Sequence, residues 1–149
     1  MGLSNVDEIL AFAIEKEQEA HDMYVGLAEK VDRPSLKAAL REFAEEELGH
    51  KAKLEAIREG SMPGFVAEKA ENLRVSDYIV AAEPSTDLDY RGALVVAIKA
   101  EDKAQAMYLA LADAARDAAL AETFRGLARE EEHHKRRFEE AYEDLVHGD

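Results

Sequence analysis

Residues that can bind metal ions recur in the two halves of the chain in matched register. Members of each pair lie 84 residues apart, and the pairs are Glu17 and Glu101, Glu47 and Glu131, and His50 and His134. A repeat at a fixed offset indicates a repeated structural unit. Carboxylate oxygens and imidazole nitrogens are ligands that suit iron, manganese and zinc. The spacing therefore predicts a centre for two metal ions, with ligands from both repeats.

A Glu-x-x-His motif occurs in each repeat, and in the second repeat it occurs twice in overlapping register. Residues three apart lie on the same face of a helix, about one turn along, so both side chains can reach one metal ion. Positions at helical spacing from Glu131 and His134 are mainly apolar, whereas those from Glu130 and His133 are polar or small. The periodicity therefore selects Glu131 and His134 for the interior and predicts that Glu130 and His133 face water.

Four carboxylates lie in the middle of apolar stripes, and they are those of Glu17, Glu47, Glu101 and Glu131. Burial of an unpaired carboxylate costs several kcal/mol, so four of them in one core need cationic partners. Two divalent metal ions would balance the four negative charges and leave the two histidines as neutral ligands. A purely structural core with hydrogen-bonded histidines is the alternative.

The elements that must position these residues are long helices. Asn5 is expected to cap the first, with Glu8 as its capping-box partner, and an apolar stripe continues to about Val31. Pro34 suits the first turn of a second helix, and Gly60 is a natural end for it. The short connection between these helices predicts an antiparallel hairpin.

The helical pattern breaks between positions 61 and 86, where only Val75–Ala82 is expected to form a short helix. A third long helix is expected to begin near Thr86 or Asp87, and a fourth near Asp117. Signals for strands and tight hairpins are missing. The sequence therefore predicts an all-α four-helix bundle of two helical hairpins joined by a long crossover. The repeat predicts an approximate two-fold axis through the bundle core.

Length and composition exclude several classes of protein. The chain of 149 residues suits a single domain spanning 1–149. It has no cysteine, which excludes thiolate metal sites and iron–sulfur clusters. A net charge of −14 disfavours nucleic acids and anionic membranes as partners and favours cations. The longest apolar run, Ala93 to Ile98, is too short to cross a membrane, and no signal-peptide pattern is present, so a cytoplasmic location is expected.

The repeated motifs resemble those of the ferritin-like di-metal carboxylate proteins, and most closely those of the rubrerythrin-type domain. The resemblance covers nearly the whole chain apart from the crossover, and four segments carry it, at 17–24, 47–50, 101–108 and 131–134. It implies a ferritin-like four-helix bundle. It also implies a ligand set with a Glu from each of two helices and a Glu-x-x-His from each of the other two.

The resemblance implies a role for each of these residues. We expect Glu17 and Glu101 to be terminal ligands, each bound to one metal ion. Glu47 and Glu131 are expected to bridge the two ions. His50 and His134 are each expected to bind one ion. Tyr24 and Tyr108 resemble tyrosines that hydrogen-bond to such carboxylates and hold them in place, with ordinary core packing as the alternative. The expected cofactor is a pair of metal ions, iron in the first place, with manganese or zinc as alternatives.

A few positions depart from related patterns. Rubrerythrins have a further carboxylate ligand, associated with peroxide chemistry, where this chain has Ala104, whose repeat mate is Ala20. Leu48 stands where bacterioferritins have a haem-binding methionine, so no haem is expected. His21, four residues after Glu17, is interpreted as a surface residue or an outer neighbour of the site, because its repeat mate is not a histidine. The pattern therefore predicts a nearly symmetric site without the additional carboxylate.

Three functions fit such a centre. The first is an oxidoreductase, in which a reduced di-iron or iron–manganese centre reacts with O2 or peroxide. The chain lacks the Cys-ligated module of rubrerythrins, so the electrons would come from a separate donor protein. The second function is iron oxidation coupled to storage or delivery, and the third is a metal-binding bundle without redox chemistry. The resemblance also implies a homodimer, and neither a nucleic acid nor a membrane is expected as a partner.

Overall fold

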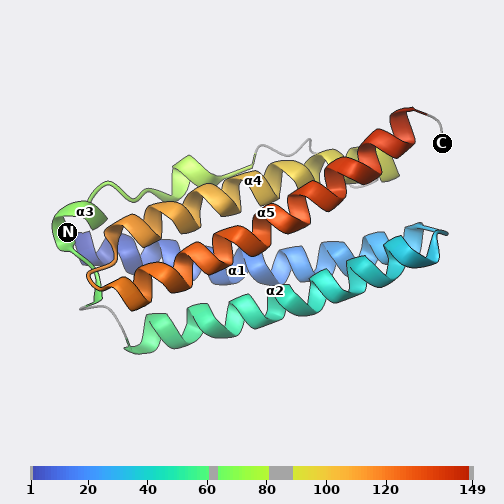
Figure 1. Cartoon of the computed structure of the whole chain (residues 1–149). Coiled ribbons are helices and arrows are strands. Elements are labelled where there is room, and N and C mark those ends of the chain that lie inside the picture. Colours follow the sequence, from blue (N-terminus) through green and yellow to red (C-terminus); the bar gives the residue numbers. More distant parts are fainter. Residues whose placement is uncertain (1, 61–63, 81–88, 148–149) are drawn as a thin grey trace.

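Four long helices form two antiparallel hairpins that lie side by side (Figure 1). The computed structural model describes residues 2–60, 64–80 and 89–147. The first hairpin consists of α1 (Gly2–Lys30) and α2 (Pro34–Gly60), and the second of α4 (Tyr90–Ala114) and α5 (Ala118–Val146). The described part of the chain contains no strand beyond a single isolated bridge. The predicted all-α bundle of two hairpins is therefore confirmed.

Local sequence signals account for most helix ends. Pro34 opens α2 and Gly60 ends it, as expected from the sequence. Asp117 caps α5, because its carboxylate accepts a 2.8 Å hydrogen bond from the backbone N–H of Leu120. Asp89 caps α4 in the same way. This helix therefore begins at Tyr90, later than the sequence predicts, and the expected starts at positions 86 and 87 lie outside the described residues.

The expected cap of the first helix is wrong. α1 already begins at Gly2, so Asn5 lies within the helix and does not cap it. The Asn5 side-chain amide instead donates to the backbone carbonyl oxygens of Glu71, at 3.0 Å, and Ala70, at 3.5 Å. Asn5 thus ties the crossover to α1, a long-range contact that a local capping pattern does not reveal.

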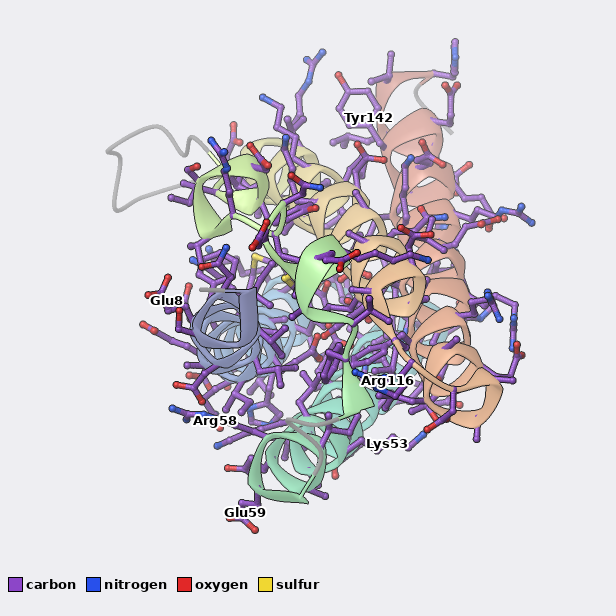
Figure 2. All side chains as sticks on the ribbon, turned by 90° about the vertical axis from the view of Figure 1, so that its left-hand side faces the viewer. Glu8, Lys53, Arg58, Glu59, Arg116 and Tyr142 are labelled. Atoms are coloured by element: carbon purple, nitrogen blue, oxygen red, sulfur yellow. The ribbon has the colours of Figure 1, made fainter. Side chains whose placement is uncertain are left out.

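The crossover contains two short helices, α3 (Ala67–Ala70) and the 3-10 helix η2 (Val75–Tyr78). α3 is not expected from the sequence. The short helix expected at Val75–Ala82 is present only as η2, because the backbone is extended at Ile79, and Ile79 and Val80 are not helical. Positions 81 and 82 are outside the described residues. Phe65 forms an antiparallel bridge with Ala115. Figure 2 looks along the bundle from this end and shows Arg116 beside the crossover. The crossover therefore packs against the turn between α4 and α5.

Apolar side chains form two clusters along the bundle. One lies at the end covered by the crossover and includes Ile9, Leu54 and Phe124. The other lies toward the opposite end and includes Leu40 and Phe138. Each long helix contributes to both clusters, which leaves a stretch between them in the middle of every helix. None of the described helices is long and apolar enough to cross a membrane.

Candidate metal centre

Acidic and histidine side chains fill the stretch between the two apolar clusters. Each is at most 2% exposed, and among the described residues they are the only buried polar or charged side chains. They are Glu17 from α1, Glu47 and His50 from α2, Glu101 from α4, and Glu131 and His134 from α5. The structure thus brings together all the residues that the sequence selects as metal ligands.

These side chains divide into two groups of four, and each group could hold one metal ion. Within a group, one potential ligand atom per residue lies within 4.8 Å of the others. The groups are Glu17, Glu47, His50 and Glu131, and Glu47, Glu101, Glu131 and His134. Glu47 and Glu131 belong to both groups, which is the arrangement that carboxylates bridging two metal ions require.

In the first group, the carboxylates gather around the Nδ1 atom of His50. Carboxylate oxygens lie 3.1 Å from this atom in Glu47, 3.2 Å in Glu131 and 3.3 Å in Glu17. One ring nitrogen of His50 thus approaches three acidic side chains, which come from α1, α2 and α5. A cation bound between these atoms would have one nitrogen and several oxygen ligands, a set that suits iron, manganese or zinc.

The second group repeats this geometry around His134. Its Nδ1 atom lies 3.6 Å from a carboxylate oxygen of each of Glu47, Glu101 and Glu131. The Oε1 atoms of Glu47 and Glu131 are the same atoms that approach His50. The two groups are therefore related by the repeat in the sequence.

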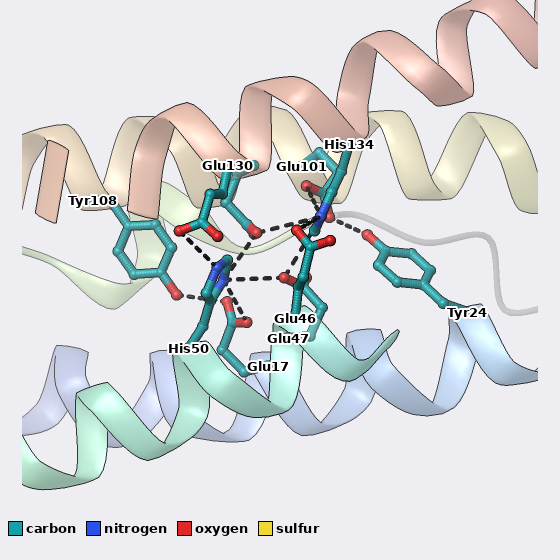
Figure 3. Close-up of polar contacts among 10 residues, drawn as sticks. Glu17, Tyr24, Glu46, Glu47, His50, Glu101, Tyr108, Glu130 and His134 are labelled. Carbon is teal, nitrogen blue, oxygen red and sulfur yellow. Dashed lines mark hydrogen bonds and ion pairs between the residues drawn. The ribbon is translucent and has the colours of Figure 1, made fainter. Parts of the chain in front are cut away.

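Two tyrosines flank the cluster and cross-link the two hairpins (Figure 3). Tyr108 on α4 donates a 2.6 Å hydrogen bond to Glu17 on α1. Tyr24 on α1 donates one to Glu101 on α4. Burial and the neighbouring carboxylates raise the pKa of both tyrosines well above the ordinary value, so the phenols remain protonated donors. Both hydroxyl groups are thus directed at the site and do more than fill the core.

Two further acidic residues, Glu46 and Glu130, contact the outer side of the histidine rings. The Nε2 atom of His134 hydrogen-bonds to Glu46 at 3.1 Å, and the Nε2 atom of His50 lies 3.4 Å from Glu130. Glu130 was predicted to face water, and it is 43% exposed, but its carboxylate reaches back across the bundle to His50. Since these residues are also 84 apart, the repeat could have revealed the pair.

Burial and mutual repulsion raise the pKa values of the interior carboxylates. For Glu17, burial first and the charge of Glu131 second raise the pKa to about 7. For Glu101, the same two causes raise the pKa to about 8. Burial and three neighbouring carboxylates raise the pKa of Glu47 well above its ordinary value. Protons thus compensate part of the negative charge when no metal ion does so.

The pKa values of the two histidines are raised for the complementary reason. Burial lowers the pKa of His50, but its close contacts with the carboxylates of Glu131 and Glu17 and their charges outweigh this effect and raise the pKa to about 11. For His134, burial is likewise outweighed, chiefly by Glu101, and the pKa rises to about 9. The site therefore favours positive charge at the positions of both rings.

Several buried atoms of the cluster have no hydrogen-bond partner, which is rare in protein interiors. Within the described residues, every buried side-chain nitrogen or oxygen without a partner belongs to the candidate ligands. These atoms are Oε2 of Glu17, both carboxylate oxygens of Glu47, both ring nitrogens of His50, Oε2 of Glu101, Oε1 of Glu131 and Nδ1 of His134. Two bound metal ions would supply the missing partners, because each cation would bind carboxylate oxygens and the Nδ1 atom of one neutral histidine.

His21 and His133 lie outside the cluster. Nδ1 of His21 lies 2.9 Å from a carboxylate oxygen of Asp22, its sequence neighbour. His133 is exposed and packs its ring edge against Phe43 at a centroid distance of 5.8 Å. The exposure of His133 confirms the choice of His134 as the interior residue of the two.

Two helical hairpins around a buried cluster of carboxylates and histidines define the class of ferritin-like bundles with a dinuclear metal site. The sequence model of the rubrerythrin family matches residues 8–82 and 93–148. The chain therefore belongs to the rubrerythrin family. This family implies a dinuclear metal site, in agreement with the geometry of the cluster. No protein of curated function and no solved structure matches the chain.

Proposed function

We propose that the chain binds two iron ions and acts as an oxidoreductase that reduces O2 or peroxide. The ligands are Glu17, Glu47, His50, Glu101, Glu131 and His134, with Glu47 and Glu131 as bridges. The observation that carries the proposal is the set of buried, unpaired carboxylate and imidazole atoms in two overlapping groups. Manganese in one position, or zinc, is compatible with the same oxygen and nitrogen ligands.

A pair of iron ions bound there would supply the electrons and the Lewis acidity for reduction of O2 or peroxide. The protein residues orient the ligands. Tyr24 and Tyr108 hold the terminal carboxylates with their hydroxyl groups, and both remain protonated because their pKa values are raised. Glu46 hydrogen-bonds to Nε2 of His134, and the carboxylate of Glu130 lies 3.4 Å from Nε2 of His50. Both carboxylates favour a proton on Nε2, which leaves each Nδ1 free to bind a metal ion.

Partners follow from the same proposal. The sequence contains no cysteine, so it holds no Cys-ligated iron centre of its own. We propose that a separate protein delivers the electrons. A homodimer, a cytoplasmic location and a single domain over residues 1–149 complete the proposal and rest on the family and on the sequence pattern.

Metal analysis and optical spectroscopy test this function together. Purified protein is freed of metal, loaded with Fe(II) without oxygen and then exposed to air. We expect two iron ions per chain, an oxo-bridged di-iron absorption band and oxygen uptake that stops unless a reductant is supplied. Continued consumption of Fe(II) beyond two ions per chain would favour iron oxidation and storage instead. Failure to bind two ions of iron, manganese or zinc would contradict the dinuclear site itself.

A further inference from the structure

A cavity of about 310 Å3 lies beside the candidate metal centre, on the side formed by α1 and α4. Its inner wall consists of the carboxylates of the centre, from Glu17, Glu47, Glu101 and Glu131. Neither histidine lines it. Both histidines come from the α2 and α5 side of the bundle. The cavity therefore reaches the centre from the side opposite the nitrogen ligands, where a bound metal ion would have an accessible face.

The other walls of this cavity are mainly apolar. Large apolar side chains from α1 and α4 form most of them, and these include Phe12, Met23, Val96 and Met107. Tyr78 and Val80 contribute from the described part of the crossover, whose helix η2 packs against α4 (Figure 1). A cavity of a few hundred Å3 with apolar walls and a small polar region is typical of small-molecule sites.

Small residues create the space next to the carboxylates. Ala20 and Ala104 both line the cavity, and they are repeat mates on α1 and α4. These are the two positions where an additional carboxylate ligand could have approached the metal ions. The small alanine side chains leave the space beside the carboxylates open to a ligand. They also add no polar group of their own to the cavity.

The size of the cavity exceeds what O2 or peroxide requires. One water molecule needs about 10–15 Å3 of such space, and the two oxidants are only slightly larger. The cavity is therefore large enough for an organic molecule of several carbon atoms. Apolar walls do not solvate a charged molecule, and four carboxylates that balance two divalent ions leave no net positive charge at the inner wall to attract an anion.

Two lysines at the cavity are already engaged. The ammonium group of Lys16 pairs with Glu19 at 3.1 Å, and that of Lys103 donates to the backbone carbonyl oxygen of Asp77 at 3.3 Å. Both lysines are exposed residues, so neither presents a buried charge to the cavity. The chemistry of the walls thus favours an uncharged ligand.

We propose that this cavity binds an uncharged aliphatic molecule with its inner end beside the metal centre. Binding of the molecule depends only on the cavity, whereas the position of the molecule next to metal ions rests on the proposed function. The ligand would occupy the face of the centre that the histidines leave open. Ala20 and Ala104 set the length of chain that the cavity accommodates.

A series of primary alcohols from butan-1-ol to decan-1-ol tests the proposal by calorimetry with zinc-loaded protein. We expect each added methylene to tighten binding about threefold to fourfold until the chain fills the cavity. Ala104→Phe should weaken the binding of octan-1-ol at least tenfold and move the length limit to shorter alcohols. Ala52→Phe, at an exposed position on α2, is the matched control and should change the affinity less than twofold.

Paramagnetic relaxation in manganese-loaded protein tests the position of the ligand. Mn(II) should broaden the proton signals of bound octan-1-ol, whereas zinc-loaded protein should not. Circular dichroism and metal content establish that Ala104→Phe is folded, and Ala20→Phe replaces it if it is not. Absence of octan-1-ol binding by a protein that binds two metal ions would overturn the inference and leave the proposed function intact.

Other outcomes are equally decisive. Wild-type affinity in a folded Ala104→Phe variant would place the alcohol elsewhere and overturn the inference. The wild type could instead have the native mass of a dimer and bind no alcohol, while Ala104→Phe has the mass of a monomer. That result would identify this face as a contact between two copies of the chain and would also overturn the inference. Alcohol binding with no metal binding would support the cavity and contradict the proposed function.

Discussion

The hydroxyl group of Tyr108 on α4 donates a 2.6 Å hydrogen bond to the carboxylate of Glu17 on α1, across the interface between the two hairpins. Its repeat mate makes the corresponding contact in the opposite direction, from Tyr24 to Glu101. Each terminal carboxylate of the candidate centre is thus held by a tyrosine from the other hairpin. The docking of the hairpins and the geometry of the centre are therefore linked.

Removal of the Tyr108 hydroxyl group should weaken metal binding. We expect Tyr108→Phe to lower the metal affinity about 10–100-fold, as is typical when a partner of a ligand is lost, while two ions still bind at saturation. Competitive titration with a chelator measures the change. Tyr90→Phe, which removes a hydroxyl group from a residue packed in the other apolar cluster, is the control and should have wild-type affinity. Equal affinity in both variants would mean that Tyr108 only packs in the core.

Glu130 should act through His50 and not through a metal ion. We expect Glu130→Ala to weaken metal binding about 10–100-fold, because the ring of His50 loses the carboxylate that lies 3.4 Å from its Nε2 atom. The nitrogen chemical shifts of His50 in the zinc-loaded protein should show a less fixed tautomer, a readout that a general loss of stability would not produce. Glu45→Ala, at an exposed position on α2, is the control. Unchanged histidine shifts in Glu130→Ala would contradict this positioning role.

Neutralisation of Glu47 should stabilise the metal-free protein and disrupt the dinuclear centre. Glu47 is fully buried, both of its carboxylate oxygens lack a hydrogen bond, and neighbouring carboxylates raise its pKa. We expect Glu47→Gln to raise the free energy of unfolding at pH 8 by about 1–4 kcal/mol without metal. The same variant should fail to bind two metal ions tightly.

Denaturant unfolding with and without Zn(II) measures both effects of Glu47→Gln. The exposed Glu55 on the same helix offers the control Glu55→Gln, which should lie within about 0.5 kcal/mol of the wild type. A metal-free Glu47→Gln protein that is less stable than the wild type would show that this carboxylate supports the fold without metal.

The stability of the metal-free protein should fall as the pH rises from about 5 to about 9. Glu17 and Glu101 have pKa values raised to about 7 and about 8, so the folded state holds protons that the unfolded chain has released. His50 and His134, with pKa values of about 11 and about 9, act in the same direction, and their contribution is lost as the pH passes these values. The folded state binds more protons throughout, so the slope is negative.

Thermal unfolding across this pH range, with and without metal, measures the effect. Metal binding displaces these protons, so the stabilisation by saturating Zn(II) should grow as the pH rises. The double variant Glu17→Gln/Glu101→Gln should flatten the pH dependence of the metal-free protein. An unchanged slope in the double variant would contradict the contribution of Glu17 and Glu101 and assign the effect to other ionisable groups, including the two histidines.

Much of the fold and of the candidate site could be predicted from the sequence because helix periodicity is local. The apolar neighbours at helical spacing placed Glu131 and His134 inside and His133 outside, and the structure agrees for all three. Pro34 and Asp117 marked helix starts because their backbone and side-chain preferences act within one turn.

Only the tertiary structure revealed how side chains meet across the two hairpins. The contact of Glu130 with His50, the use of Asn5 to hold the crossover, and the cavity beside Ala104 all join residues far apart in the chain. Helical spacing states which face of a helix is buried, but not which residues of another helix it meets. That pairing depends on how the hairpins dock, and a long flexible side chain such as that of Glu130 can reach inward from a position that periodicity assigns to water.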